Sequence, residues 1–120
     1  MRKTFAILAL LWTFAIIVFC LIDLSVIASR TPKVSIPYID KWMHFTIYVI
    51  FAFLWRMAID TGKTKNWAFI FFAIAFGVII EIAQQYTGYR SFEWHDIIAN
   101  SLGVISGFVL VQIIKKSSRY

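Results

Sequence analysis

The chain has 120 residues, which is enough for one domain and too few for several. Hydrophobic residues make up 61% of it and charged residues only 15%, whereas soluble domains average about 25% charged residues. This composition excludes an ordinary soluble domain. The net charge of +6 is carried by residues that flank apolar segments, so it fits anionic lipid headgroups and topology signals better than nucleic acid.

The first apolar segment, residues 4–22, holds nineteen uncharged residues after Arg2 and Lys3. At 1.5 Å per residue, such a helix spans roughly 28 Å, close to the hydrocarbon thickness of a bilayer. A cleaved signal peptide is the alternative, but the apolar region of a signal peptide usually has about 7–15 residues. We therefore expect a transmembrane helix here, followed by a loop that Pro32 and Pro37 break.

Three more apolar segments predict transmembrane helices at about residues 41–59, 66–86 and 96–114. Gly62 and Gly88 are expected to stop the first two of these helices. Arg56, about one turn from a helix end, is expected to snorkel to the membrane surface. The predicted fold class is an all-α integral membrane protein, with one transmembrane domain of four helices covering residues 1–120.

A stripe of small residues runs along the last predicted helix. Ala99, Gly103 and Gly107 are spaced by four, which places them on one face and lets another helix approach closely. Helix packing is the favoured interpretation of this stripe. A thin wall beside a site is the alternative.

The distribution of lysine and arginine predicts the orientation of the helices. With the N-terminus inside, the inner segments hold eight of these residues: Arg2, Lys3, Arg56, Lys63, Lys65, Lys115, Lys116 and Arg119. The outer segments hold four: Arg30, Lys33, Lys41 and Arg90. Because cytoplasmic loops carry the excess of positive residues, we expect both termini in the cytoplasm.

On this topology, the polar residues gather at the outer ends of the last three helices and in the loop before the fourth. They are Asp40, Lys41, His44, Glu81, Gln84, Gln85, Arg90, Glu93, His95, Asp96 and Asn100. Three i,i+4 pairs each present two polar groups on one helix face: Asp40 with His44, Glu81 with Gln85, and Asp96 with Asn100. Ionisable groups at membrane depth indicate a functional site, so we expect these faces to enclose a polar pocket.

Such a pocket has the groups for two kinds of chemistry. His44 with Asp40, Glu81 and Asp96 forms a hypothetical acid–base set, since a histidine with a carboxylate can transfer protons. Lys41 and Arg90 could hold a phosphate or carboxylate of a lipid headgroup, and two carboxamides complete the predicted substrate-binding set, Gln84 and Asn100. No cofactor is expected. A divalent metal on Asp40, Glu81, Asp96, His44 and His95 is the alternative, although no HExxH-type or CxxC spacing supports it.

Each of these residues also has a structural interpretation. Asp96 and Asp40 could be helix N-caps, and Glu81 could pair with Arg90 or Lys41. The nearby aromatic residues are more typical of an interfacial belt than of ligand stacking: Trp42, Tyr86, Tyr89 and Trp94. The gathering of so many polar groups on one side of the membrane favours a site over separate caps.

Three elements together resemble the VanZ-like family of bacterial membrane proteins: DKxxHF at 40–45, ExxQ at 81–84, and RS followed by DxxxNxxGxxxG at 90–107. The matching motif positions are Asp40, Lys41, His44, Glu81, Gln84, Arg90, Asp96 and Asn100. A named member of that family is associated with low-level teicoplanin resistance, so the resemblance implies a role at the cell envelope and a place in the bacterial plasma membrane. It implies no established reaction.

Three functional hypotheses follow. In the first, an outward-facing polar pocket binds or acts on a lipid-linked or anionic envelope molecule, with glycopeptide tolerance as the implied phenotype; whether it is an enzyme stays open. The second is a small transporter or flippase subunit, which the lack of ionisable groups other than Cys20 in residues 4–22 disfavours. The third is a structural membrane subunit whose small-residue stripe docks another helix. The bilayer is the expected partner, and the oligomeric state is left open.

Overall fold

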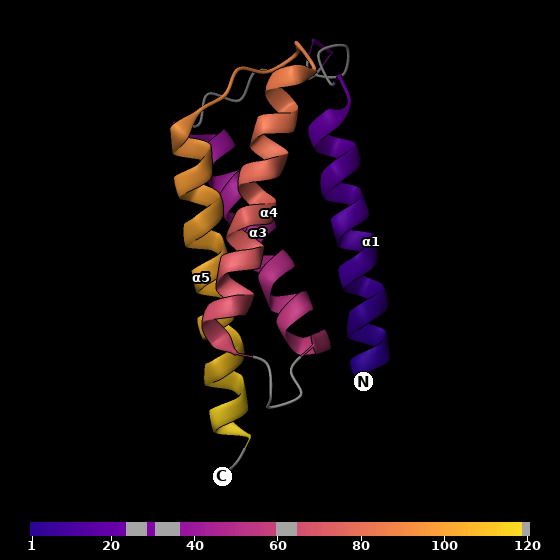
Figure 1. Cartoon of the computed structure of the whole chain (residues 1–120), viewed down its shortest axis with the longest axis vertical. Coiled ribbons are helices and arrows are strands. Elements are labelled where there is room, and N and C mark those ends of the chain that lie inside the picture. The colour runs from indigo at the N-terminus through magenta and orange to yellow at the C-terminus, as the bar shows by residue number, and fades with distance from the viewer. Residues whose placement is uncertain (24–28, 31–36, 60–64, 119–120) are drawn as a thin grey trace.

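The computed structural model describes residues 1–23, 29–30, 37–59 and 65–118. Within these ranges the chain is helical and has no strand; its helices are α1 (Arg2–Leu21), α3 (Ile39–Ile59), α4 (Asn66–Tyr86) and α5 (Trp94–Ser117) (Figure 1). Each of these four helices is long and apolar enough to cross a membrane. The predicted all-α membrane fold with four transmembrane helices is therefore confirmed.

The start of α5 differs from the prediction. The helix begins at Trp94 with Glu93 as its N-cap residue, and it continues to Ser117 rather than to residue 114. Asp96 thus lies inside the first turn, where its backbone amide donates a hydrogen bond of 3.1 Å to the carbonyl of Glu93. The interpretation of Asp96 as an N-cap was therefore wrong, and its buried carboxylate needs another explanation. The predicted breaks at Pro32 and Gly62 lie outside the described residues.

The bundle is elongated, with principal extents of 50 × 27 × 26 Å. The start of α1 and the end of α5 lie at one end, together with the end of α3 and the start of α4, and the loop from α4 to α5 lies at the other end (Figure 1). If each of the four helices crosses the membrane, both termini share one side of it. That this side is the cytoplasm remains a prediction from the charge distribution.

Apolar side chains point both inward and outward, as expected for helices in lipid. The core holds Tyr48, Phe51, Ala52, Ala73, Ile80 and Val104, all buried. Large apolar side chains also cover the outside, with Phe14 67% and Phe72 70% exposed. The predicted belt residues Trp42, Tyr86, Tyr89 and Trp94 are likewise exposed. Water would make such a surface costly, whereas lipid solvates it.

The small-residue stripe packs inside the chain. A methyl group added to Gly103 would overlap the carbonyl oxygen of Phe45, and one added to Gly107 would overlap that of Val49. These glycines therefore allow the backbones of α3 and α5 to lie against each other. The packing interpretation holds, but the partner helix is α3 of the same chain rather than a helix of another protein.

Arg56 does not snorkel to the surface. Its side chain is 3% exposed, and its Nη2 donates a hydrogen bond of 2.7 Å to the side-chain oxygen of Asn66. The guanidinium carbon lies 5.6 Å from the ring centre of Phe69 and 5.3 Å from that of Phe108. Cation–π contact and the Asn66 oxygen compensate for burial of this charge, so the snorkelling prediction was wrong.

Candidate functional site

The ammonium of Lys41 joins three carboxylates at the end of the bundle where α4 connects to α5. It donates hydrogen bonds of 2.6 Å to Asp40 Oδ2 and 2.6 Å to Asp96 Oδ1, and a third to Glu93 Oε2. A lysine ammonium has three protons to donate, so this residue uses its whole capacity within the protein. Lys41 thereby links the start of α3 with the loop before α5 and with the first turn of α5.

His44, one helical turn further along α3, lies beside Asp96 and Asn100. Its Nδ1 is 2.9 Å from Asn100 Oδ1, and its Nε2 is 3.6 Å from Asp96 Oδ2. Arg90, in the loop between α4 and α5, brings its Nη2 to 3.4 Å from His44 Nε2 and to 3.8 Å from Asp96 Oδ2. The side chain of Asp96 is 1% exposed and that of Arg90 is 44% exposed, so Arg90 approaches a buried pair from outside.

Glu81 comes from α4 and completes the arrangement. Its side chain lies close to those of His44 and Asp96. One nitrogen or oxygen atom from each of the three side chains lies within 4.8 Å of the other two. Its Oε1 accepts a hydrogen bond of 3.3 Å from the backbone amide of Glu93. We call the residues that meet here the polar cluster: Asp40, Lys41, His44, Glu81, Arg90, Glu93, Asp96 and Asn100.

Two sequence-based expectations about this region need correction. Gln85 is exposed, whereas Gln84 is fully buried, so the residue that shares the inner face with Glu81 is Gln84. His95 is exposed and belongs to α5 rather than to the loop, and it is in neither of the two groups of residues near enough to share a metal ion. The pairs Asp40–His44 and Asp96–Asn100 do face the polar cluster. The roles assigned to these residues remain predictions.

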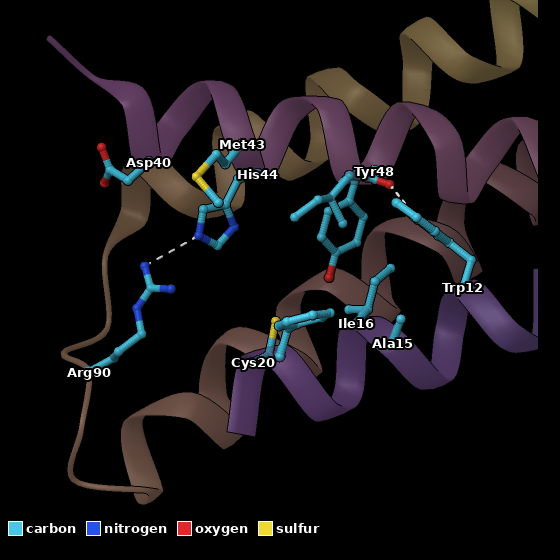
Figure 2. A pocket seen from close by; sticks show the side chains of 11 residues that line it. Trp12, Ala15, Ile16, Cys20, Asp40, Met43, His44, Tyr48 and Arg90 are labelled. Atoms are coloured by element: carbon cyan, nitrogen blue, oxygen red, sulfur yellow. Dashed lines mark hydrogen bonds between the residues drawn. The ribbon is translucent and has the colours of Figure 1, made fainter. Parts of the chain in front are cut away.

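A cavity of about 330 Å³ lies between α1 and α3 and reaches the polar cluster. Its walls are mostly apolar and include Trp12, Ile16, Phe19, Cys20, Met43 and Ile47. Asp40, His44 and Arg90 line one end, and Figure 2 shows the Arg90 side chain extending from its loop toward His44. Tyr48 also lines this space, and its buried hydroxyl has no hydrogen-bond partner among the described residues.

Sequence reasoning missed the contribution of α1 to the site. Trp12 donates a hydrogen bond of 3.1 Å from its Nε1 to the carbonyl of Ile47, and Trp55 Nε1 donates one of 2.9 Å to Thr13 Oγ1. These bonds hold α1 against α3 along one side of the cavity. Between residues 5 and 21, Thr13 is the only hydroxyl-bearing residue of α1 and no residue is charged, so little in this helix marks such a role. The two tryptophans, inside apolar segments, were the available signal.

The fold and the cavity define a multi-pass helical membrane protein with a buried polar cluster at one end of its bundle. The family model described as VanZ/LLP1 matches residues 3–115, so this chain belongs to the VanZ/LLP1 family. The match includes α1 and extends the resemblance seen over residues 40–107 to nearly the whole chain.

Among curated proteins, the chain is similar to the "Uncharacterized protein C11E3.10" of the yeast Schizosaccharomyces pombe. The two are 28% identical over 85 residues, which cover 69% of this chain and 52% of that protein. The chain thus spans about half the length of this relative. No solved structure matches. Because the relative comes from a eukaryote, the likeness itself does not point to a bacterial membrane.

Proposed function

We propose that the protein binds an anionic amphiphile of the membrane, with the head group at Arg90 and an apolar tail in the cavity between α1 and α3. The observation that carries this proposal is the cavity itself, whose walls are apolar and whose end carries His44 and Arg90. A molecule with a charged head and a hydrocarbon tail matches that distribution. The volume of about 330 Å³ falls within the range of known ligand pockets, roughly 300–1,000 Å³.

Arg90 is the cation best suited to the head group. Lys41 is held by three carboxylates, whereas the Arg90 side chain is 44% exposed and its nearest cluster groups are 3.4 Å and 3.8 Å from Nη2. A guanidinium presents several N–H donors in a plane and binds phosphate or carboxylate with two parallel hydrogen bonds. Of the two residues predicted to bind an anion, we therefore assign only Arg90 to the ligand, whereas Lys41 stabilises the polar cluster.

The tail can enter from the lipid. Phe19 is 64% exposed and Met43 is 57% exposed, so side chains that face the bilayer border the cavity. Deeper inside, the Tyr48 hydroxyl offers a donor, one helical turn or about 6 Å along α3 from His44. An ester or amide carbonyl below a phosphate head would accept that hydrogen bond. These features favour a lipid, or a lipid-linked molecule, over a free anion.

The orientation and the biological setting are part of the same proposal. If the termini are cytoplasmic, the polar cluster faces outward and its ligand belongs to the outer leaflet or the cell envelope. In a bacterial plasma membrane, a lipid-linked envelope precursor has the required head and tail, and binding it would provide a route to glycopeptide tolerance. Binding alone requires no reaction, so the acid–base set of His44, Asp40, Glu81 and Asp96 is not needed for it.

The two alternatives have less support. Below the polar cluster, the bundle is filled by apolar side chains such as Phe51, Ile80 and Val104, and a transporter or flippase would need a polar path across them. A structural subunit would dock a partner on the small-residue stripe, but Gly103 and Gly107 already pack against α3.

The test is native mass spectrometry of the protein extracted from membranes in mild detergent. We expect one anionic lipid to remain bound to the original chain. Arg90→Gln, which removes the cation, and Ala15→Trp, which fills the cavity, should each release it, whereas Lys116→Gln at the other end should not. Retention of no lipid by the original chain, or equal retention by all variants, would contradict the proposal.

A further inference from the structure

Three side chains from three different helices meet inside the polar cluster: His44 of α3, Glu81 of α4 and Asp96 of α5. All three are buried, and one potential ligand atom of each lies within 4.8 Å of the others. Two ligands of one tetrahedral zinc ion, each about 2.0–2.2 Å from it, are about 3.3–3.6 Å apart. Side-chain shifts of about 1 Å would therefore let all three residues share one ion.

We propose that His44, Glu81 and Asp96 bind one divalent metal ion that accepts imidazole and carboxylate ligands together, such as Zn²⁺ or Mn²⁺. Three protein ligands leave at least one coordination position open for another molecule. This inference goes beyond the proposed lipid-binding function and does not rest on it, because the metal can be titrated without any lipid.

The orientation of His44 supports a role as a ligand. Its Nδ1 lies 2.9 Å from Asn100 Oδ1, and because an amide oxygen only accepts, Nδ1 carries the proton. The other nitrogen, Nε2, then presents a lone pair toward Asp96, whose Oδ2 is 3.6 Å away. Metal-binding histidines are commonly oriented in this way, with the second ring nitrogen donating to a nearby oxygen.

The charges of the polar cluster also favour a divalent cation. Its four carboxylates face two permanent cations: Asp40, Glu81, Glu93 and Asp96 against Lys41 and Arg90. Asp40 and Glu93 are about half exposed and meet water, whereas Glu81 and Asp96 are each 1% exposed. Lys41 and Arg90 lie beside Asp96, and among the described residues Glu81 forms no ion pair. Buried charges are costly unless they are paired, and one divalent ion supplies the missing positive charge.

A buried oxygen of Glu81 supports the metal site independently of the charges of the polar cluster. Among the described residues, its Oε2 is buried and has no hydrogen-bond partner, although the side chain points into the group formed with His44 and Asp96. A second group, Asp40 with Glu93 and Asp96, is also near enough to share an ion, but there Lys41 contacts all three carboxylates. The group that contains Glu81 is therefore the one we assign to the metal.

The test uses the full chain in detergent, without a polyhistidine tag and stripped of metal, titrated with Zn²⁺ and with Mn²⁺ in a calorimeter. We expect one equivalent of at least one of these ions to bind. Glu81→Gln and His44→Gln should each weaken binding at least 10-fold. Asn100→Ala should weaken it about 10- to 100-fold through the lost orientation of His44. Binding of neither ion to the original chain would overturn the proposal.

Matched controls separate this site from other carboxylates and histidines. His95→Gln removes an exposed histidine of α5 and should bind the metal as the original chain does. Glu93→Gln removes a carboxylate of the second group and should weaken metal binding much less than Glu81→Gln does, because Glu93 adds to the negative charge of the cluster without being a ligand. Loss of binding in Glu93→Gln with full binding in Glu81→Gln would also overturn the proposal. Gel filtration of each variant shows whether it is folded. If one variant does not fold, the remaining variants still allow ligand and control substitutions to be compared.

The substitution Arg90→Gln distinguishes the proposed metal binding from the proposed lipid binding. Its Nη2 lies 3.4 Å from His44 Nε2, so the guanidinium competes with a cation for that nitrogen. Arg90→Gln should therefore strengthen metal binding several-fold, while the proposed lipid binding requires that the same variant release the lipid. An unchanged or weakened metal affinity in Arg90→Gln would contradict the placement of the ion at Nε2.

Discussion

Lys41 and Asp96 are 55 residues apart in the sequence, and their side chains form an ion pair of 2.6 Å between α3 and α5. The side chain of Asp96 is 1% exposed and that of Lys41 is 20% exposed. The same ammonium also holds Asp40 and Glu93. A single cation thus fixes the entrance of α3, the loop before α5 and the first turn of α5.

Lys41→Met should destabilise the protein, because it keeps most of the apolar stem and leaves Asp96 buried beside fewer positive charges. Removing one partner of a buried ion pair costs about 3–5 kcal/mol, and we expect about 3 kcal/mol here because Arg90 also lies near Asp96. Reversible unfolding in mixed detergent micelles measures this free energy.

Glu93→Gln is the matched control for that experiment. The side chain of Glu93 is 46% exposed, so its ion pair with Lys41 is largely solvated and should contribute less than about 1 kcal/mol. If the two variants lost equal stability, the ion pair with Asp96 would have no special role in holding α3 against α5.

Gly103→Ala should also destabilise the bundle, for a steric reason. The added methyl group would overlap the carbonyl oxygen of Phe45, which belongs to the backbone of α3 and cannot turn away. Overpacking of this kind costs about 1–3 kcal/mol. Ser106→Ala, at an exposed position of the same helix, should change stability by less than about 0.5 kcal/mol in the same unfolding assay. A neutral Gly103→Ala would show that α3 and α5 are not tightly packed at this point.

Most of the fold was predictable from the sequence, because apolar segments long enough to cross a bilayer identify transmembrane helices. The limits of α4 were predicted at residues 66–86, as observed. The limits of α5 were not, because a short polar loop with Glu93, His95 and Asp96 offers several residues that could begin a helix. N-cap preferences alone do not show which of these residues begins the helix, because Asp96 is buried in an ion pair with Lys41 instead of capping it.

The site was predictable in part. Helix spacing places residues three and four positions apart on one face, so Glu81 could share its face with Gln84 or with Gln85. Only the packing of α4 against its neighbours decides that Gln84 is buried. The burial of Arg56 and the wall formed by α1 depend in the same way on contacts between segments distant in the sequence, which periodicity does not report.

The orientation of the bundle is tested by thiol labelling of intact cells. With Cys20 replaced by alanine, single cysteines are placed at Ser91 and Ser118, which are exposed at opposite ends of the bundle. If both termini are cytoplasmic, a membrane-impermeant reagent should label the cysteine at position 91 and label that at 118 only after the cells are opened. The reverse pattern would turn the polar cluster toward the cytoplasm and exclude an outer-leaflet ligand.

The most direct test of the central claim is the preference of the protein for the charge of a lipid head. Phosphatidic acid and the uncharged diacylglycerol with identical short acyl chains would be titrated into the purified protein in detergent. We predict that the anionic lipid binds at least about 10-fold more tightly, which corresponds to one charge-assisted hydrogen bond of about 1.4 kcal/mol at Arg90, and that Arg90→Gln removes the difference. Equal binding of the two lipids by the original chain would contradict the claim that this site recognises an anionic amphiphile.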